Sequence, residues 1–161
     1  MSRLQKGLWL YWGVQFYFKV MSLNFEDYRT EANIWLKKVA ECLDIQDRDK
    51  AGRIFRAVLH ALRDRLPASE AAHLGAQLPI IWKGVYYDGY RPNREPVRIR
   101  HEEDWLQFIY EKDPVAKAND FPTLEDAKRA FEGVMLALRE LLSAGQYEQV
   151  AQGLHKEIKP S

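Results

Sequence analysis

Few residues of this 161-residue chain could carry out catalysis or bind a metal. The four histidines, His60, His73, His101 and His155, are not spaced from one another as metal ligands are. Cys42 is the single cysteine, which excludes an internal disulfide and a cluster of thiolates, and no recognisable base partner accompanies it. The Gly-x-Ser-x-Gly elbow, the phosphate-binding glycine loop and the dinucleotide fingerprint are missing from the sequence. We therefore expect no enzyme, no metal site and no cofactor.

Residues suited to recognition are concentrated in "LPIIWKGVYYDGY", where four large aromatic residues stand beside a lysine and two glycines. On a helix that begins at Pro79, the apolar side chains would cover one broad face and close the core of a helical domain. The alternative is an outward-facing aromatic patch that binds a protein partner. The candidate partner-binding residues are Trp82, Lys83, Tyr87 and Tyr90.

The following segment, "YRPNREPVRIRH", sets its basic side chains against Glu95 alone. It is either a solvated connector stiffened by proline or a site that holds a phosphate or an acidic partner. The whole chain has 24 Lys and Arg against 23 Asp and Glu, so its overall charge indicates neither nucleic acid nor an anionic membrane as a partner. Any basic site must be local. The candidate residues of this basic linker are Arg91, Arg94, Arg98 and Arg100.

The spacing of apolar residues predicts that helices position these candidates. Phe55, Val58 and Leu62 recur at intervals of three and four, which is the period of an amphipathic helix. Asp47 can cap the start of that helix, and Thr123 begins a capping-box-like start for another. The expected class is all-α, with helices near residues 25–43, 48–66, 70–78, 102–112, 123–143 and 146–158. A further helical turn or two is expected from Pro79, followed by a linker near 89–101.

The chain also contains an internal repeat. "AGRIFRAVLHALRDRLPASEAAHLGAQL", from Ala51, aligns without gaps with "AKRAFEGVMLALRELLSAGQYEQVAQGL", from Ala127. Related stretches that begin at Trp35 and Trp105 precede the two blocks. We expect a helical bundle of two pseudo-repeated units packed on a pseudo-twofold axis. Residues 21–161 would form this single duplicated domain, with repeats at about 25–88 and 102–158.

Two arginines recur in both blocks, and we expect them to be structural. Arg53 corresponds to Arg129, and Arg63 corresponds to Arg139. An arginine beside an apolar stripe can bridge to a helix C-terminus or to a carboxylate between the units. A ligand-binding role is the alternative.

The N-terminal residues 1–20 form an aromatic extension of doubtful status. Its run "GLWLYWGVQFYFKV" has 14 residues, fewer than the roughly 20 apolar residues of a membrane-spanning helix. Three interpretations stay open: an upstream extension with synthesis starting at Met21, a strand or short helix docked on the bundle, or an interfacial anchor.

The stretch "RAVLHALRDRLPASEAAHLGAQLPIIWKGVYYDGY" resembles the bacterial and archaeal family called domain of unknown function 2267, in which a long helix is followed by "EAxxLxAQLP", an Arg-Gly pair and an aromatic-Gly-Trp ending. The resemblance covers about residues 21–158. Lys83 stands where the family has Arg, and Tyr90 stands where it has Trp. The resemblance implies a duplicated helical bundle and no assigned activity.

These observations favour a non-enzymatic, cytoplasmic, all-helical module that binds a protein partner or assembles with itself. One alternative is a regulator that binds nucleic acid through the basic linker, although the nearly equal numbers of basic and acidic residues in the chain disfavour it. The other is a helical bundle that binds a small ligand or a metal between its halves.

Overall fold

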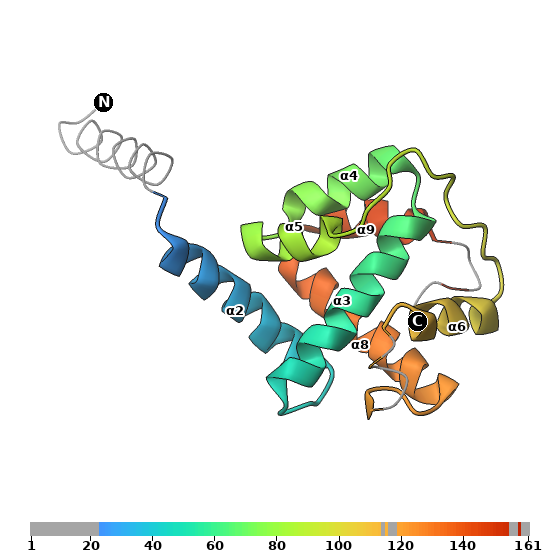
Figure 1. Ribbon diagram of the computed structural model, residues 1–161, viewed down its shortest axis with the longest axis horizontal. Helices are drawn as coiled ribbons and strands as arrows, with labels where there is room; N and C mark the ends of the chain where they lie inside the picture. The colour runs from blue at the N-terminus through green and yellow to red at the C-terminus, as the bar shows by residue number, and fades with distance from the viewer. Residues whose placement is uncertain (1–22, 114, 116–118, 155–157, 159–161) are drawn as a thin grey trace.

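The computed structural model describes residues 23–113, 115, 119–154 and 158, and all regular structure in that part of the chain is helical (Figure 1). The expected all-α class is confirmed. The interpretations of residues 1–20 fall outside the described residues. None of the described helices is long and apolar enough to cross a membrane. The helices are α2 (Phe25–Cys42), α3 (Arg48–Arg65), α4 (Ala68–Gln77), α5 (Ile80–Tyr87), α6 (Glu102–Glu111), α8 (Leu124–Leu141) and α9 (Ala144–Gln152).

Local signals set the helix ends. The Asp47 carboxylate accepts hydrogen bonds from the first free N–H groups of α3, and Thr123 forms a full capping box with Asp126 at α8. Ser143 forms a second capping box, so α9 begins at Ala144 rather than near residue 146. It also ends at Gln152, well before the expected residue 158.

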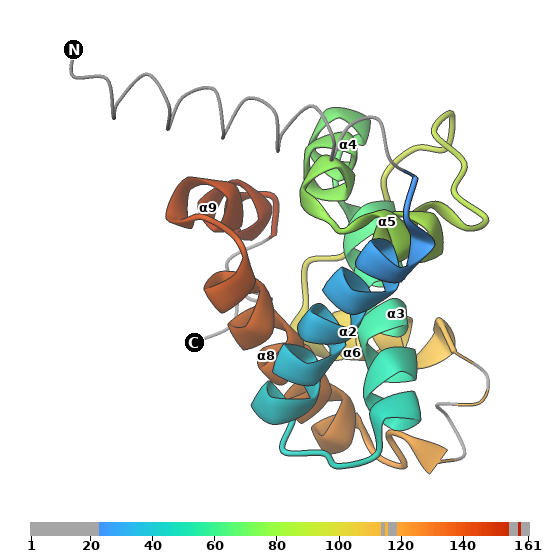
Figure 2. The ribbon, with the colours of Figure 1, turned by 90° about the vertical axis from the view of Figure 1, so that its left-hand side faces the viewer.

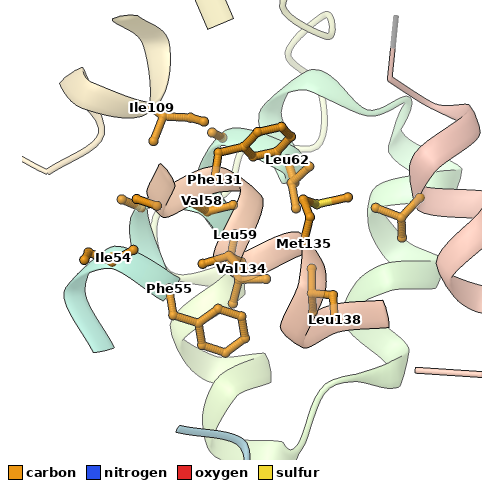
Figure 3. Packing of buried hydrophobic residues seen from close by; sticks show 14 of the residues in the cluster. Ile54, Phe55, Val58, Leu59, Leu62, Ile109, Phe131, Val134, Met135 and Leu138 are labelled. Atoms are coloured by element: carbon orange, nitrogen blue, oxygen red, sulfur yellow. The ribbon is translucent and has the colours of Figure 1, made fainter. Parts of the chain in front are cut away.

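The centre of the core lies between α3 and α8. Figure 3 shows apolar side chains of α3 meeting those of α8, and both sets are almost fully buried. Each such side chain contributes about 1.5–3 kcal/mol of hydrophobic stabilisation when it leaves water. These residues are Ile54, Phe55, Val58, Leu59 and Leu62 on α3, and Phe131, Val134, Met135 and Leu138 on α8. The amphipathic stripe predicted from their spacing is thus the centre of the fold.

The remaining helices surround this pair (Figures 1 and 2). In chain order we call α2–α5 the first half and α6–α9 the second half. Helix α2 packs against α3 and α8, α6 packs against α8 and α3, and α4 packs against α9. The crossing of α2 and α8 is close at Gly133, where an added Cβ would lie 2.7 Å from Leu43 Cδ2 and 3.1 Å from the carbonyl oxygen of Cys42. A side chain at this position would push the end of α2 away from α8.

Helix α5 closes the core of the first half. Trp82 is buried, its indole N–H donates to the carbonyl oxygen of Ala32 at 3.0 Å, and its ring meets Phe55 edge-on at 4.6 Å. Tyr86 is fully buried and donates its hydroxyl to the carbonyl oxygen of Ala71. These contacts tie α5 to α2, α3 and α4, so most of the aromatic stretch serves packing.

Arg53 links α3 to the segment ahead of α8. Its guanidinium donates two hydrogen bonds, at 2.7 and 2.9 Å, to the buried carboxylate of Asp120 ahead of α8. The hydrogen bonds to Asp120 raise the pKa of Arg53 above its ordinary value. Its counterpart Arg129 instead pairs with Asp126 on its own exposed helix face.

Candidate functional site

The aromatic stretch from Leu78 to Tyr90, which we call the aromatic corner, meets the basic linker in a polar pocket with a volume of about 380 Å³. We call it the basic pocket. It forms where the end of α3, the turn after α5 and the end of α6 converge, so segments far apart in the sequence supply its walls. Its aromatic and charged lining residues are Arg63, Asp64, Tyr90, Arg91, Arg94, Glu95 and Lys112. Four of these are cationic and two are anionic, which leaves an excess of positive charge.

Asp64 organises the inner wall of the basic pocket. Its carboxylate accepts a hydrogen bond from Lys112 Nζ and another, at 2.9 Å, from Arg63 Nε. Burial alone would raise the pKa of Asp64, but the hydrogen bonds and positive charges of Lys112 and Arg63 outweigh burial and hold it below its ordinary value. Asp64 is therefore ionised at neutral pH and fixes both cations in place.

Arg63 connects the basic pocket to α5. It is buried, with 6% of its side chain exposed, and Nη1 donates to the carbonyl oxygens of Tyr86 and Asp88 at 2.6 and 2.8 Å. These are carbonyls at the C-terminal end of α5, where a positive charge is favourable. The guanidinium carbon also lies 5.5 Å from the centre of the Tyr90 ring. The expected bridge from a repeated arginine to a helix C-terminus is present here.

The four partner-binding candidates of the aromatic corner take different places. Trp82 is in the core, so its inclusion as a surface candidate was wrong; its spacing four residues before Tyr86 puts it on the inward face of α5. Lys83 is half-buried, and Tyr87 is exposed with its ring against Tyr86 and Tyr90. Of the four candidates, Tyr90 is the one that lines the basic pocket.

The basic linker likewise divides into two parts. All four of its candidate arginines are exposed. Arg91 and Arg94 line the basic pocket, whereas Arg98 and Arg100 do not. The sequence could not show this division, because it depends on where the chain turns after Gly89, whose φ of +68° is a left-handed conformation. Asp64 and Lys112 were missed because their link spans distant positions and no motif marks it.

The other side chains that could bind a metal or take part in catalysis do not form a site. Glu70 and His73 have helical i, i+3 spacing, and Oε2 of Glu70 lies 3.9 Å from Nδ1 of His73. Across the described part of the chain, however, no three His, Cys, Asp and Glu side chains converge as metal ligands. Burial lowers the pKa of His60, whose Nε2 lies 2.6 Å from the carbonyl oxygen of Val85, so this ring is neutral at pH 7 and held by the backbone.

A second concavity, which we call the α8 groove, lies on the other half of the molecule. It is open, has a volume of about 530 Å³, and runs between the end of α2 and the outer faces of α8 and α9. Leu136 is 47% exposed in it, and Arg139 is exposed as well. The groove is lined by Cys42, Leu43, Asp44, Arg129, Glu132, Gly133, Met135, Leu136, Arg139 and Tyr147. None of the partner-binding or basic-linker candidates lines this groove, but the repeated arginines Arg129 and Arg139 do.

The described part of the chain is thus all-helical and carries the basic pocket and the α8 groove. The sequence model of the family described as uncharacterized conserved protein (DUF2267) matches residues 32–161. The chain therefore belongs to this family, and the resemblance inferred from its "EAAHLGAQLP" region is confirmed. No curated protein matches the chain significantly.

Proposed function

We propose that the chain is a non-enzymatic interaction module of the cytoplasm that binds an acidic segment of a protein partner in the basic pocket. The observation that carries this proposal is the convergence of Tyr90, Arg91 and Arg94 beside the Arg63–Asp64–Lys112 cluster. Arg91 and Arg94 are exposed and can pair with carboxylates. The Tyr90 ring offers apolar surface next to them, a combination common at protein interfaces.

The shape and charge of the basic pocket favour a protein segment over nucleic acid. A nucleic-acid surface needs several cations in a row along the phosphate backbone. Here Asp64 neutralises two of the cations, and Glu95 faces the same space as Arg91 and Arg94. A short acidic peptide can place one or two carboxylates on the arginines while avoiding Glu95.

We also propose that the two halves arose by duplication. Asp64 and Glu140 stand at the same position of the two aligned blocks. Asp64 pairs with Lys112 from α6, and Glu140 accepts a hydrogen bond at 2.9 Å from Lys38 of α2. Each of α3 and α8 thus carries a carboxylate, at the same repeat position, that receives a lysine from α2 or from the end of α6. The matching pairs α2–α3 and α6–α8 support the same relation.

The test of the function is a native pull-down of the tagged chain from its host at physiological salt, in which the native chain is compared with two variants. The pocket variant is Arg91→Glu with Arg94→Glu, and the matched control is Arg98→Glu with Arg100→Glu. The two double variants change the charge of the chain equally, and only the first alters the basic pocket. A stoichiometric protein partner retained by the native chain and the control, and lost by the pocket variant, supports the proposal.

Other outcomes identify the alternatives. Nucleic acid, measured by absorbance at 260 nm against 280 nm and lost equally from both double variants, would favour the regulator hypothesis. A rise in melting temperature with zinc or inorganic phosphate, without a protein partner, would favour the small-ligand hypothesis. Retention of the protein partner by the Arg91/Arg94 variant would refute the basic pocket as its binding site.

A further inference from the structure

Residues 89–96, which we call the arginine loop, are fixed at both ends to neighbouring residues of α3. At the start of the loop, Arg63 Nη1 donates to the carbonyl oxygen of Asp88 at 2.8 Å. At its end, the backbone N–H of Val97 donates to the carbonyl oxygen of Asp64 at 2.9 Å. The arginine loop therefore leaves the bundle and returns to it at one place, as a compact surface loop does. Loops held in this way by a rigid scaffold are common sites of binding residues.

Two tight turns set the course of the arginine loop. In the first turn, the N–H of Tyr90 donates to the carbonyl oxygen of Tyr87 at 3.0 Å, and Gly89 supplies the positive φ of +68° that this turn requires. In the second turn, the N–H of Arg94 donates to the carbonyl oxygen of Arg91 at 3.1 Å. A proline follows Arg91, and its fixed φ suits that position of a turn. Arg91 and Arg94 are thus the first and fourth residues of one turn, which brings their Cα atoms within about 7 Å of each other.

The side chains that line the basic pocket leave two positive charges in excess, because four of them are cationic and two are anionic. The two cations of the inner wall are both joined to Asp64. Arg91 and Arg94 are exposed, and Glu95 is the other anion of the pocket. A ligand with two negative charges on one group would balance this excess, whereas a single carboxylate would balance half of it.

We infer that the acidic segment bound in the basic pocket carries a phosphorylated serine, threonine or tyrosine, whose phosphoryl group lies between Arg91 and Arg94. The inference rests on the function proposed above and names the chemistry of the partner. A phosphoryl group carries nearly two negative charges at neutral pH and has three acceptor oxygens, so two guanidinium groups of one turn can donate to it in pairs of hydrogen bonds. Exposed arginine–carboxylate pairs are individually weak and screened by salt. The phosphoryl group therefore supplies affinity that the carboxylates around it do not.

The Tyr90 ring forms a wall of the basic pocket beside the arginine loop and is held in place. Its centre lies 5.8 Å from the centre of the Tyr87 ring and 5.5 Å from the guanidinium carbon of Arg63. Because the ring and the loop are already ordered, little conformational freedom is lost on binding. The volume of about 380 Å³ accommodates a phosphorylated side chain together with its backbone.

The first arm of the test uses phenyl phosphate and phthalate as probes, in a buffer without inorganic phosphate. Both probes are aromatic and carry about two negative charges at pH 7.5, and phenyl phosphate carries them on one phosphoryl group. Binding to the full-length chain is measured from the NMR shifts of the backbone amide signals of the arginine loop. We expect phenyl phosphate to bind about tenfold more tightly than phthalate, and the variant Arg91→Gln with Arg94→Gln to lose about tenfold in affinity for it. The matched control Arg98→Gln with Arg100→Gln should keep the native affinity. Equal affinity for the two probes, or native affinity in the Arg91/Arg94 variant, overturns the inference.

The second arm distinguishes a phosphorylated protein from a small phosphate ester. The pull-down described above is repeated with host extract that has been treated with a protein phosphatase. Loss of the protein partner after this treatment supports the inference. A partner that survives the treatment but is lost by the Arg91→Glu, Arg94→Glu variant leaves the acidic-partner function intact and rejects the phosphorylated side chain. Retention of the partner by that variant refutes the proposed function itself, and phenyl phosphate binding would then assign the arginine loop to a small phosphate ester instead of a protein.

Discussion

Replacing Arg63 with Met tests how strongly a buried arginine holds α5 on the bundle. The substitution keeps an unbranched apolar stem but removes the hydrogen bonds to Asp64, Tyr86 and Asp88 and the contact with the Tyr90 ring. Hydrogen bonds to charged groups contribute about 1.5–3 kcal/mol each in isolation, and they are not additive. Asp64 keeps Lys112 as a partner, so its charge is not left alone. We expect a loss of about 3–5 kcal/mol in the free energy of unfolding.

The assay is urea unfolding followed by circular dichroism. With a slope of about 2 kcal/mol per molar urea, the unfolding midpoint should fall by about 2 M. The matched control is Arg139→Met at the equivalent, exposed position, which should change stability by less than about 1 kcal/mol. If both variants lose the same stability, or if Arg63→Met unfolds at the native midpoint, then the contacts of Arg63 do not stabilise the fold and the reasoning is refuted.

Two further substitutions test the packing and the pH response of the same half. In Gly75→Ala the new Cβ would lie 2.2 Å from the Tyr87 hydroxyl oxygen and 2.6 Å from Cζ, so the ring must move and we expect a loss of about 1–3 kcal/mol in urea unfolding. Gly84→Ala is the control in α5, where a Cβ meets nothing within 4 Å, and it should stabilise by about 0.5–1 kcal/mol; a loss in the control would contradict this account. Burial lowers the pKa of His60 in the folded state, so the unfolded chain takes up the proton first, and the free energy of unfolding should fall as the pH drops below about 6.5. His60→Gln keeps an N–H for Val85 and should reduce this fall between pH 7.5 and 5.5, whereas an unchanged pH dependence would exclude His60 as its source.

The helices could be predicted from the sequence because their signals are local. Asp47 and Thr123 cap the first turns of α3 and α8, as predicted. The regularly spaced apolar residues of α3 are buried in the core. The start of α9 was predicted two residues late, because the Ser143 capping box begins this helix at Ala144, before Gly145. Gly145 is therefore tolerated in the first turn of α9.

The site could be predicted only in part, because its geometry depends on tertiary contacts. Tyr90, Arg91 and Arg94 stand together in the sequence, so their common location was recognisable as a cluster of aromatic and basic residues. The link between Asp64 and Lys112 joins positions 48 residues apart, and it exists because α6 packs against α3. No local pattern could place those two side chains in one wall.

The contrast between Arg63 and Arg139 shows why a repeated residue need not repeat its role. Both occupy the same position of an amphipathic helix, where the long stem lies along apolar surface and the guanidinium reaches past it. In the first half the chain continues into α5, and the carbonyl groups at the end of this helix accept the hydrogen bonds that the Arg63 guanidinium would otherwise donate to water. In the second half the described chain has no such helix, and Arg139 stays exposed beside Leu136. What decides the role of each arginine is therefore the element that packs over its helix face, and not its position in the aligned blocks.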